Sequence, residues 1–170
     1  MSSLNAISNP DLALDATDLR LLAELQADAS RTNQELAAAC HVSPATALRR
    51  VRRLVEAGVI ERQVAIVSPQ AAGPAAGLQA VVEVTLDRQG AEHLDAFEQQ
   101  AVADDAVQQC WRVSPGPDFV LVLHVDGMPG YQALAQRLFT QNANVRNVKT
   151  YFSVRRAKFD TRIPLRGAAG

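Results

Sequence analysis

The chain has 170 residues, of which 48% are hydrophobic and 21% are charged, and its formal net charge is −1. This composition excludes a disordered polymer and leaves enough apolar residues for one large domain or two small ones. No apolar run approaches the roughly 18 residues of a membrane span, and the N-terminal stretch MSSLNAISNPDLALD lacks the basic start and apolar core of a leader, so we expect a cytoplasmic protein with no membrane partner.

Capping residues predict two helices near the start of the chain. Asp15, with Asp18 three residues later, is placed to begin a helix over residues 15–28, which carries leucines at helical spacing. Thr32 and Glu35 form the pattern of a capping box ahead of a short second helix. A turn separates the two helices.

A third helix and a strand follow. Ser43 is a favourable N-cap, and Pro44 stands at the first helical position, where its missing N–H costs nothing. The helix is expected to run to Ala57 and to end at Gly58, which suits a left-handed residue. The stretch VIERQVAIV, residues 59–67, has the composition of a strand. Three short helices followed by a strand predict a winged helix-turn-helix.

The rest of the chain changes its hydrophobic period. After a linker rich in proline, glycine and alanine, strands are predicted at 78–86, 107–114, 118–125 and 145–154, and helices at 90–103 and 129–141. The order strand, helix, strand, strand, helix, strand is that of a ferredoxin-like βαββαβ domain, whose sheet leaves one face free for a partner. The predicted class is therefore α+β. Its parts are a flexible arm (1–13), the winged helix-turn-helix (14–66), the linker (67–77), the ferredoxin-like domain (78–158) and a C-terminal tail (159–170).

The third predicted helix carries four arginines. A helical projection from Pro44 places one set of residues on the core side and another on the opposite side. The core set is Ala47, Leu48, Val51, Leu54 and Val55, and the opposite set is Ala45, Thr46, Arg49, Arg50 and Arg53. Guanidinium forks bind phosphate and the guanine edge, while small residues at the helix start allow close approach to a groove. A solvated helix face is the alternative, but it requires neither the caps nor the glycine stop.

This face predicts an interface with double-stranded DNA. Ser43, Ala45, Thr46 and Arg49 are expected to approach base edges, as the N-terminal end of a recognition helix does. The expected phosphate contacts are Arg50, Arg52 and Arg53. The acidic residues Asp15, Asp18 and Glu24 are expected to face away from the duplex.

Several stretches together resemble the Lrp/AsnC family of leucine-responsive transcriptional regulators. They include LDATDLRLLAELQADAS, SPATALRRVRRLVEAGVIE, VQQCWRVSPGPDFVLVL and VKTYFSV, and the resemblance spans about residues 14–158. It implies a DNA-binding domain, a ferredoxin-like domain that dimerises and binds an effector, and assembly of homodimers into larger rings such as octamers. It also implies an amino acid as effector, bound between neighbouring dimers.

The effector region departs from the family pattern in its loop between the middle strands. Pro115 stands where the family usually has glycine, and Gly116 where it has an acidic residue, whereas Asp118 and the aromatic residue after it match. An amino-acid zwitterion needs an acceptor for its ammonium group and donors for its carboxylate. Ser114, Gly116, Asp118 and Thr150 are the residues that could supply them. The alternative, a merely stiff hairpin loop, remains open.

No catalytic constellation stands out in the sequence. The three histidines occupy separate elements, and no phosphate loop, nucleophile elbow or zinc helix occurs. We therefore expect no enzyme, no metal and no cofactor beyond a possible amino-acid effector. The predicted function is sequence-specific transcriptional regulation. A low-specificity architectural DNA-binding protein remains an alternative, as does an effector-sensing module with a protein or RNA partner.

Overall fold

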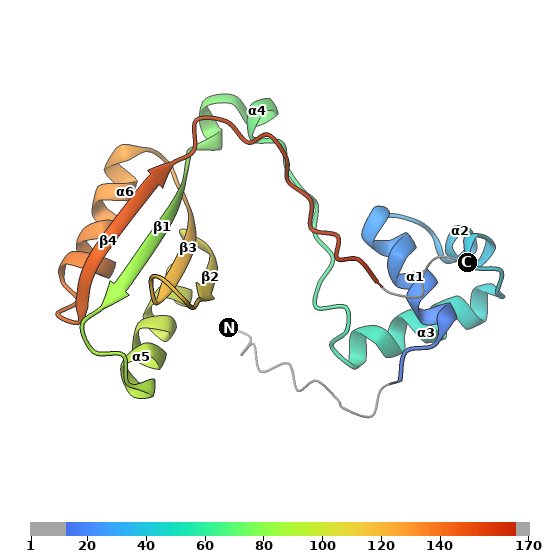
Figure 1. The fold of residues 1–170 in the computed structure, drawn as a ribbon. Helices are drawn as coiled ribbons and strands as arrows, with labels where there is room; N and C mark the ends of the chain where they lie inside the picture. Colours follow the sequence, from blue (N-terminus) through green and yellow to red (C-terminus); the bar gives the residue numbers. More distant parts are fainter. Residues whose placement is uncertain (1–12, 166–170) are drawn as a thin grey trace. The chain divides into compact units, whose positions relative to one another are not determined.

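The computed structural model describes residues 13–165 (Figure 1). Apart from Ala13, the predicted flexible arm lies outside these residues, as does the end of the predicted tail from 166 onward. The chain forms two compact units, one of residues 13–66 with 158–165 and the other of residues 67–157. No helix in the described part of the chain is long and apolar enough to cross a membrane.

The first unit contains three helices, α1 (Ala16–Ala27), α2 (Asn33–Ala39) and α3 (Pro44–Glu56). Their buried side chains meet in a small core made of Leu21, Leu36, Ala37, Cys40 and Ala47. The core uses mostly small side chains, so the helices approach one another closely. Hydrogen bonds between side chains of α1 and α3 join these helices in addition to the core.

The three helix starts are confirmed. An Asp15 carboxylate oxygen accepts hydrogen bonds from the backbone N–H groups of Thr17 (2.9 Å) and Asp18 (3.0 Å). Thr32 and Glu35 form a reciprocal capping box at α2. The Ser43 hydroxyl accepts from the backbone N–H of Thr46 at 3.2 Å. These local signals can be read from sequence because each needs residues only two or three positions apart.

The predicted strand at 59–67 is wrong. Gly58 ends the helical path in the left-handed region (φ +71°), as expected. The residues after it have no partner strand in the described part of the chain. Strand composition does not produce a strand here because a single strand has nothing with which to exchange backbone hydrogen bonds. The predicted linker is also partly helical, with the short turns α4 (Pro69–Ala72) and η1 (Gly73–Ala76).

The second unit has the predicted βαββαβ order. Its elements are β1 (Leu78–Leu86), α5 (Ala91–Val102), β2 (Val107–Arg112), β3 (Phe119–Val125), α6 (Met128–Ala135) and β4 (Val145–Phe152), with a π-helical turn, η2 (Gln136–Thr140), extending α6. The strands form one antiparallel sheet in the order β2-β3-β1-β4. The ferredoxin-like prediction is confirmed.

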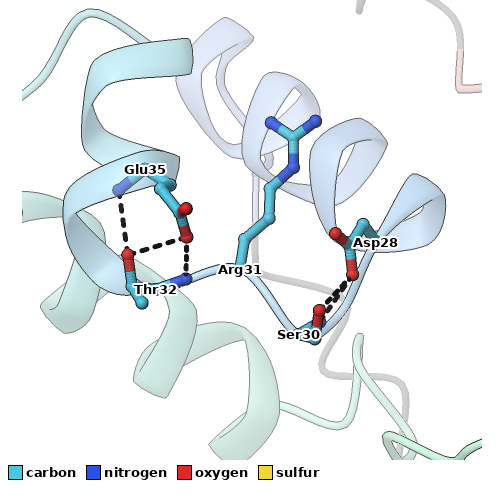
Figure 2. Close-up of a pocket in the computed structure, with 5 residues that line it drawn as sticks. All are labelled: Asp28, Ser30, Arg31, Thr32 and Glu35. Carbon is cyan, nitrogen blue, oxygen red and sulfur yellow. Dashed lines mark hydrogen bonds between the residues drawn. The ribbon is translucent and has the colours of Figure 1, made fainter.

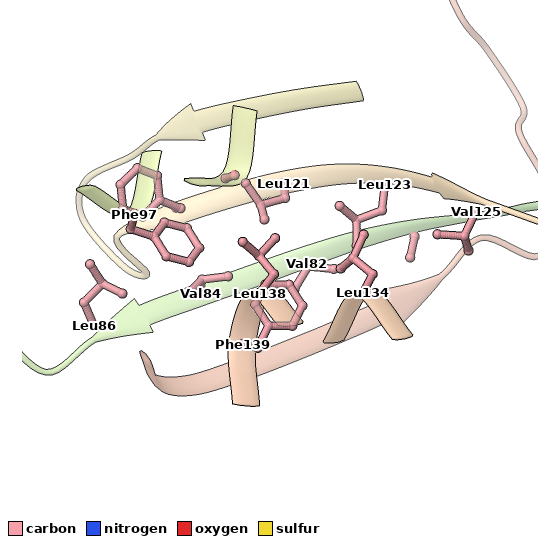
Figure 3. Close-up of a cluster of buried hydrophobic side chains, with 13 residues drawn as sticks. Val82, Val84, Leu86, Phe97, Leu121, Leu123, Val125, Leu134, Leu138 and Phe139 are labelled. Carbon is pink, nitrogen blue, oxygen red and sulfur yellow. The ribbon is translucent and has the colours of Figure 1, made fainter. Parts of the chain in front are cut away.

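Both helices of this unit pack on the same face of the sheet (Figure 3). Alternate residues of β1 and β3, such as Val82 and Leu121, point toward Leu134 and Leu138 of the α6 region. Phe97 of α5 packs against Phe119, with ring centroids 4.8 Å apart. Because side chains alternate along a strand, the other residues of the same strands form the opposite, helix-free face.

The C-terminal tail returns to the first unit. The Gln26 side chain of α1 donates a hydrogen bond to the carbonyl oxygen of Ile163 (3.3 Å) and accepts one from the Ile163 N–H (2.8 Å). One side-chain amide thus satisfies both backbone groups of one tail residue. The described part of the predicted tail is therefore held against α1.

Candidate nucleic-acid interface and effector region

Helices α2 and α3 are joined by a tight turn. His41 adopts a positive φ of 55°, and the backbone N–H of Val42 donates to the carbonyl oxygen of Ala37 at 2.9 Å. Ser43 and Ala45, at the start of α3, are exposed. The hydroxyl groups of Ser43 and Thr46 lie 2.9 Å apart and share a hydrogen bond. The turn thus presents the N-terminal end of α3 at the surface.

The orientation of α3 differs from the projection. Ala47 and Leu54 are fully buried, as predicted. Leu48 is 44% exposed and Val55 is 49% exposed, so their assignment to the core is wrong. Among the exposed residues of the helix, Ala45, Leu48, Arg49 and Arg52 are spaced i, i+3, i+4 and i+7 and therefore share one side. We call these four residues the exposed stripe.

Two of the four arginines bind an aspartate of α1. Asp18 is fully buried, and its carboxylate accepts hydrogen bonds from Arg50 Nη1 (2.9 Å) and Arg53 Nη2 (2.5 Å). Arg50 Nη1 also donates to Asp15 at 2.6 Å. Asp15 and Asp18, which were expected only to face away from the duplex, lie against two of the arginines. The two carboxylates and two guanidinium groups form one network that joins α1 to α3.

The network changes the interpretation of α3. The side chains of Arg50 and Arg53 are 20% and 39% exposed, and both are directed to Asp18. Their bonds to Asp18 join α3 to α1, an interaction that the sequence did not predict for these two residues. Arg49 and Arg52 are exposed, and neither forms an ion pair within residues 13–165. Their guanidinium groups are the ones on this helix available to an external anion.

Asp15 is expected to make the stability of this unit depend on pH only under acidic conditions. The backbone N–H of Asp18, followed by the Arg50 guanidinium, lowers the pKa of Asp15 from 3.8 to about 2. Because the folded-state pKa is the lower one, the stabilisation is complete above about pH 4 and is lost as the pH falls toward 2.

Urea unfolding at a series of pH values, followed by circular dichroism, measures this effect. Asn can cap a helix but does not titrate, so Asp15→Asn should reduce the loss of stability between pH 4 and pH 2. Because the two proteins differ only at residue 15, the difference between their curves reports on Asp15 alone. Parallel curves for the two proteins would show that Asp15 contributes nothing to the acid sensitivity.

A surface hollow lies beside the turn between α1 and α2 (Figure 2). It is lined by Asp28, Ser30, Arg31, Thr32 and Glu35. Ser30 donates to Asp28 at 2.6 Å, Thr32 and Glu35 bond each other, and Arg31 forms an ion pair with Glu24. The polar side chains of this hollow thus bond one another or, for Arg31, Glu24 of α1, and they complete a helix-connecting turn.

The predicted effector loop is anchored to β1 through Asp118. The Asp118 N–H donates to the carbonyl oxygen of Val84 (2.9 Å), and its carboxylate Oδ2 accepts from the N–H of Leu86 (2.7 Å). Ser114 and Gly116 are exposed, and Gly116 has a φ of +123°. One carboxylate oxygen of Asp118 therefore bonds the backbone of β1, while Ser114 and Gly116 face solvent.

Thr150 does not lie with this loop. It stands opposite Val82, whereas the loop is bonded to Val84 and Leu86 on the same strand. Leu86 lies four positions beyond Val82 on β1, about 13 Å along the strand, and Val84 lies two positions beyond it, about 7 Å. The Thr150 hydroxyl lies 2.7 Å from that of Tyr131 on α6. Within one chain, the structure therefore does not bring the four predicted effector residues together.

The helix-free face of the sheet carries exposed apolar side chains. Trp111 is 58% exposed, and Val81 and Tyr151, which are paired across β1 and β4, are also exposed. The Tyr151 hydroxyl donates to Glu83 at 3.4 Å, and the Lys149 amine lies 5.0 Å from the Tyr151 ring centre. This face combines aromatic surface with a polar border.

Comparison with known proteins identifies both units. A family model described as the Lrp/AsnC ligand binding domain matches residues 79–163, and one described as winged helix-turn-helix DNA-binding matches residues 14–61. An uncharacterised HTH-type transcriptional regulator of Haemophilus influenzae is 36% identical over 152 residues, which cover 89% of each chain. The chain belongs to the Lrp/AsnC family.

Other Lrp/AsnC proteins are similar over most of their length. A leucine-responsive regulatory protein of Rhizobium meliloti is 36% identical over 145 residues, 85% of this chain and 92% of the relative. A solved transcriptional regulator of Neisseria meningitidis, in complex with L-Met, superposes with a TM-score of 0.78 at 26% identity, covering 91% of this chain and 98% of the other. The predicted family and α+β fold are confirmed. As a member of the Lrp/AsnC family, this chain is a DNA-binding transcriptional regulator.

Sequence reasoning missed three residues of these regions. Asp18 was assigned to the helix start and to a side away from the duplex, although it lies three and four residues before the apolar Leu21 and Leu22 and so shares their buried side. Leu48 was assigned to the core because it is apolar. Tyr131, the partner of Thr150, gave no signal, because nothing in the sequence relates α6 to β4.

Proposed function

We propose that this regulator reads the major groove of its target with the exposed stripe of α3. The supporting observation is that Arg49 and Arg52 extend to the surface without ion-pair partners in the described residues, on a helix whose start is exposed after a tight turn. Ser43, Ala45 and Thr46 allow that start to approach base edges. Arg49 then contacts a base, and Arg52 a phosphate.

The roles first predicted for Arg50 and Arg53 change in this proposal. Their bonds to Asp18 fix the rotation of α3 and so decide which residues face the duplex. The network also keeps two positive charges from contributing fully to phosphate binding. The chain acts in the cytoplasm, where its DNA is.

The second unit is proposed to sense an amino acid or a related metabolite. A family model described as ligand binding covers it, and the Neisseria relative was solved with L-Met. Ser114, Gly116 and the free oxygen of Asp118 are proposed to contact the effector, together with Thr150. Because Thr150 stands opposite Val82, about 7 and 13 Å along β1 from the loop anchors at Val84 and Leu86, a site that uses both is proposed to draw them from two copies of the chain.

The helix-free face of the sheet supports homodimerisation. Large aromatic residues on a flat, exposed sheet commonly anchor interfaces. Trp111→Ala is expected to weaken the dimer about five- to thirty-fold, equivalent to about 1 to 2 kcal/mol, without unfolding the chain, because Trp111 is largely exposed. Sedimentation equilibrium measures the effect. Val102→Ala, also at an exposed apolar position, is the control, and an equal loss in both variants would place the interface elsewhere.

Binding measurements test the proposed function directly. The purified protein is titrated with the duplex upstream of its own gene and with random duplex, at several salt concentrations, with and without a panel of amino acids. A preference of about 10³ or more for the upstream duplex supports a sequence-specific regulator, and an amino acid that changes it identifies the effector class. Equal affinity for both duplexes favours an architectural protein. Absence of salt-dependent binding excludes the interface on α3.

A further inference from the structure

We propose that Leu48 is a specificity-determining residue that reads the 5-methyl group of a thymine in each half-site. This inference rests on the proposed DNA-reading function of α3 and adds a base contact to it. It starts from the unexpected position of Leu48, which is 44% exposed, whereas the neighbouring apolar residues Ala47 and Val51 are fully and partly buried against the small core.

The surroundings of Leu48 determine what can cover it. On the exposed stripe, Ala45 lies one turn before Leu48, Arg49 directly after it and Arg52 one turn beyond. Ala45 adds a methyl group next to the leucine, whereas Arg49 and Arg52 place positive charges around the patch. An apolar protein surface is a poor partner for such a patch, because burying it would also remove two unpaired guanidinium groups from water.

The major groove of DNA matches both properties. It presents phosphates and base acceptors to the guanidinium groups, and its one apolar group is the 5-methyl of thymine. Residues in the first two turns of a recognition helix reach base edges, and Leu48 is the fifth residue of α3. We therefore expect a thymine close to the base read by Arg49.

The experiment compares thymine with deoxyuridine. Deoxyuridine pairs with adenine in the same way and lacks only the methyl group. A preferred duplex is first selected from random sequences, and each thymine is then replaced singly. Wild-type protein should lose about fourfold in affinity at one position of each half-site, the change that corresponds to about 0.8 kcal/mol for one buried methyl group. Other positions should change little.

Variants assign the effect to Leu48. With Leu48→Ala, the thymine-to-deoxyuridine ratio at that position should fall to about 1, while the salt slope stays unchanged because no charge is lost. Val55→Ala removes apolar surface from an equally exposed residue near the other end of α3 and should keep the fourfold ratio. Leu48→Met, which keeps an apolar side chain of similar volume, should retain most of it and provides a second test if Leu48→Ala folds poorly.

The possible outcomes distinguish a failure of the inference on Leu48 from a failure of the proposed function. A wild-type protein that shows no methyl effect at any thymine overturns the inference, as does a Leu48→Ala protein that keeps the fourfold ratio. If the wild-type protein does not discriminate between selected and random duplex, the proposed function itself fails. Discrimination without a methyl effect leaves the regulator intact and removes only the role of Leu48.

Discussion

Asp18→Ala is expected to lower the free energy of unfolding of the first unit by about 3 to 5 kcal/mol, the usual cost of removing one partner from a buried ion pair. The variant leaves Arg50 and Arg53 partly buried beside an empty space, and the Nε atoms of both already lack a hydrogen-bond partner. It also removes half of the capping box at α1. Few single changes in this small unit should cost more.

Two measurements can follow the unfolding of the two units independently. Trp111 is the only tryptophan and belongs to the second unit, so its fluorescence follows the unfolding of the sheet domain. Hydrogen exchange of amides in α1–α3 follows the first unit. Asp18→Ala should speed exchange in these helices and leave the Trp111 transition unchanged.

Controls distinguish the network from a general effect of losing a carboxylate. Asp28→Ala, at the other end of α1, removes an exposed carboxylate bonded only locally to Ser30 and should cost far less. Arg53→Ala should resemble Asp18→Ala in stability, and its DNA binding should weaken through misplacement of α3. A loss below about 1 kcal/mol for Asp18→Ala would contradict the structural role of the network.

Arg49→Ala is expected to weaken binding to the preferred duplex by about 1 to 3 kcal/mol per half-site and to relax the choice of base at one position. The reason is that a guanidinium fork bonds the guanine edge with two hydrogen bonds at once. Arg49→Lys keeps the charge and loses the fork, so it should restore binding to random duplex but not the base preference. Competition among duplexes that vary at each position measures both effects.

Arg52→Ala, also on the exposed stripe, is expected to have a different effect from Arg49→Ala. If Arg52 holds a phosphate, its loss should weaken all duplexes alike and reduce the slope of log affinity against log salt by about 0.9 per half-site. The two alanine variants should therefore differ in kind: one changes base choice and the other changes salt dependence. Uniform weakening by Arg49→Ala, with unchanged base choice, would move Arg49 to the phosphate group.

Most of the fold could be predicted because its signals are local. The caps at Asp15, Thr32 and Ser43 depend on groups within three residues, and the strands of the second unit follow from alternation and turn residues. The strand expected at 59–67 failed for the converse reason. Pairing depends on a second segment, and sequence composition alone does not show whether one is within reach.

The orientation of α3 was beyond the reach of a helical projection. A projection gives the angles between residues but not the direction of the core, which was set by assuming that apolar residues are buried and charged residues are exposed. Arg50 violates the assumption because Asp18, 32 residues away in sequence, neutralises it. Leu48 violates the same assumption because it is apolar but 44% exposed. The sequence did contain one indication of this orientation. Arg50 lies three residues after the buried Ala47 and four before the buried Leu54, so it shares their side of the helix.

The geometry of the effector region could not be predicted from the sequence. The loop was chosen for the chemistry of its side chains, and sequence could not reveal that Asp118 commits one oxygen to the N–H of Leu86. The distance between this loop and Thr150 depends on strand register, which long-range pairing sets.

The bond between Gln26 and Ile163 has a consequence for the order in which the protein is made. The first unit includes the tail from residue 158, so it is discontinuous in sequence, with the whole second unit inserted between its two parts. At about 5 to 20 residues per second, a ribosome delivers the tail on the order of ten seconds after α3 has been synthesised. The DNA-binding unit begins first and is completed last, after the sheet domain has emerged in full.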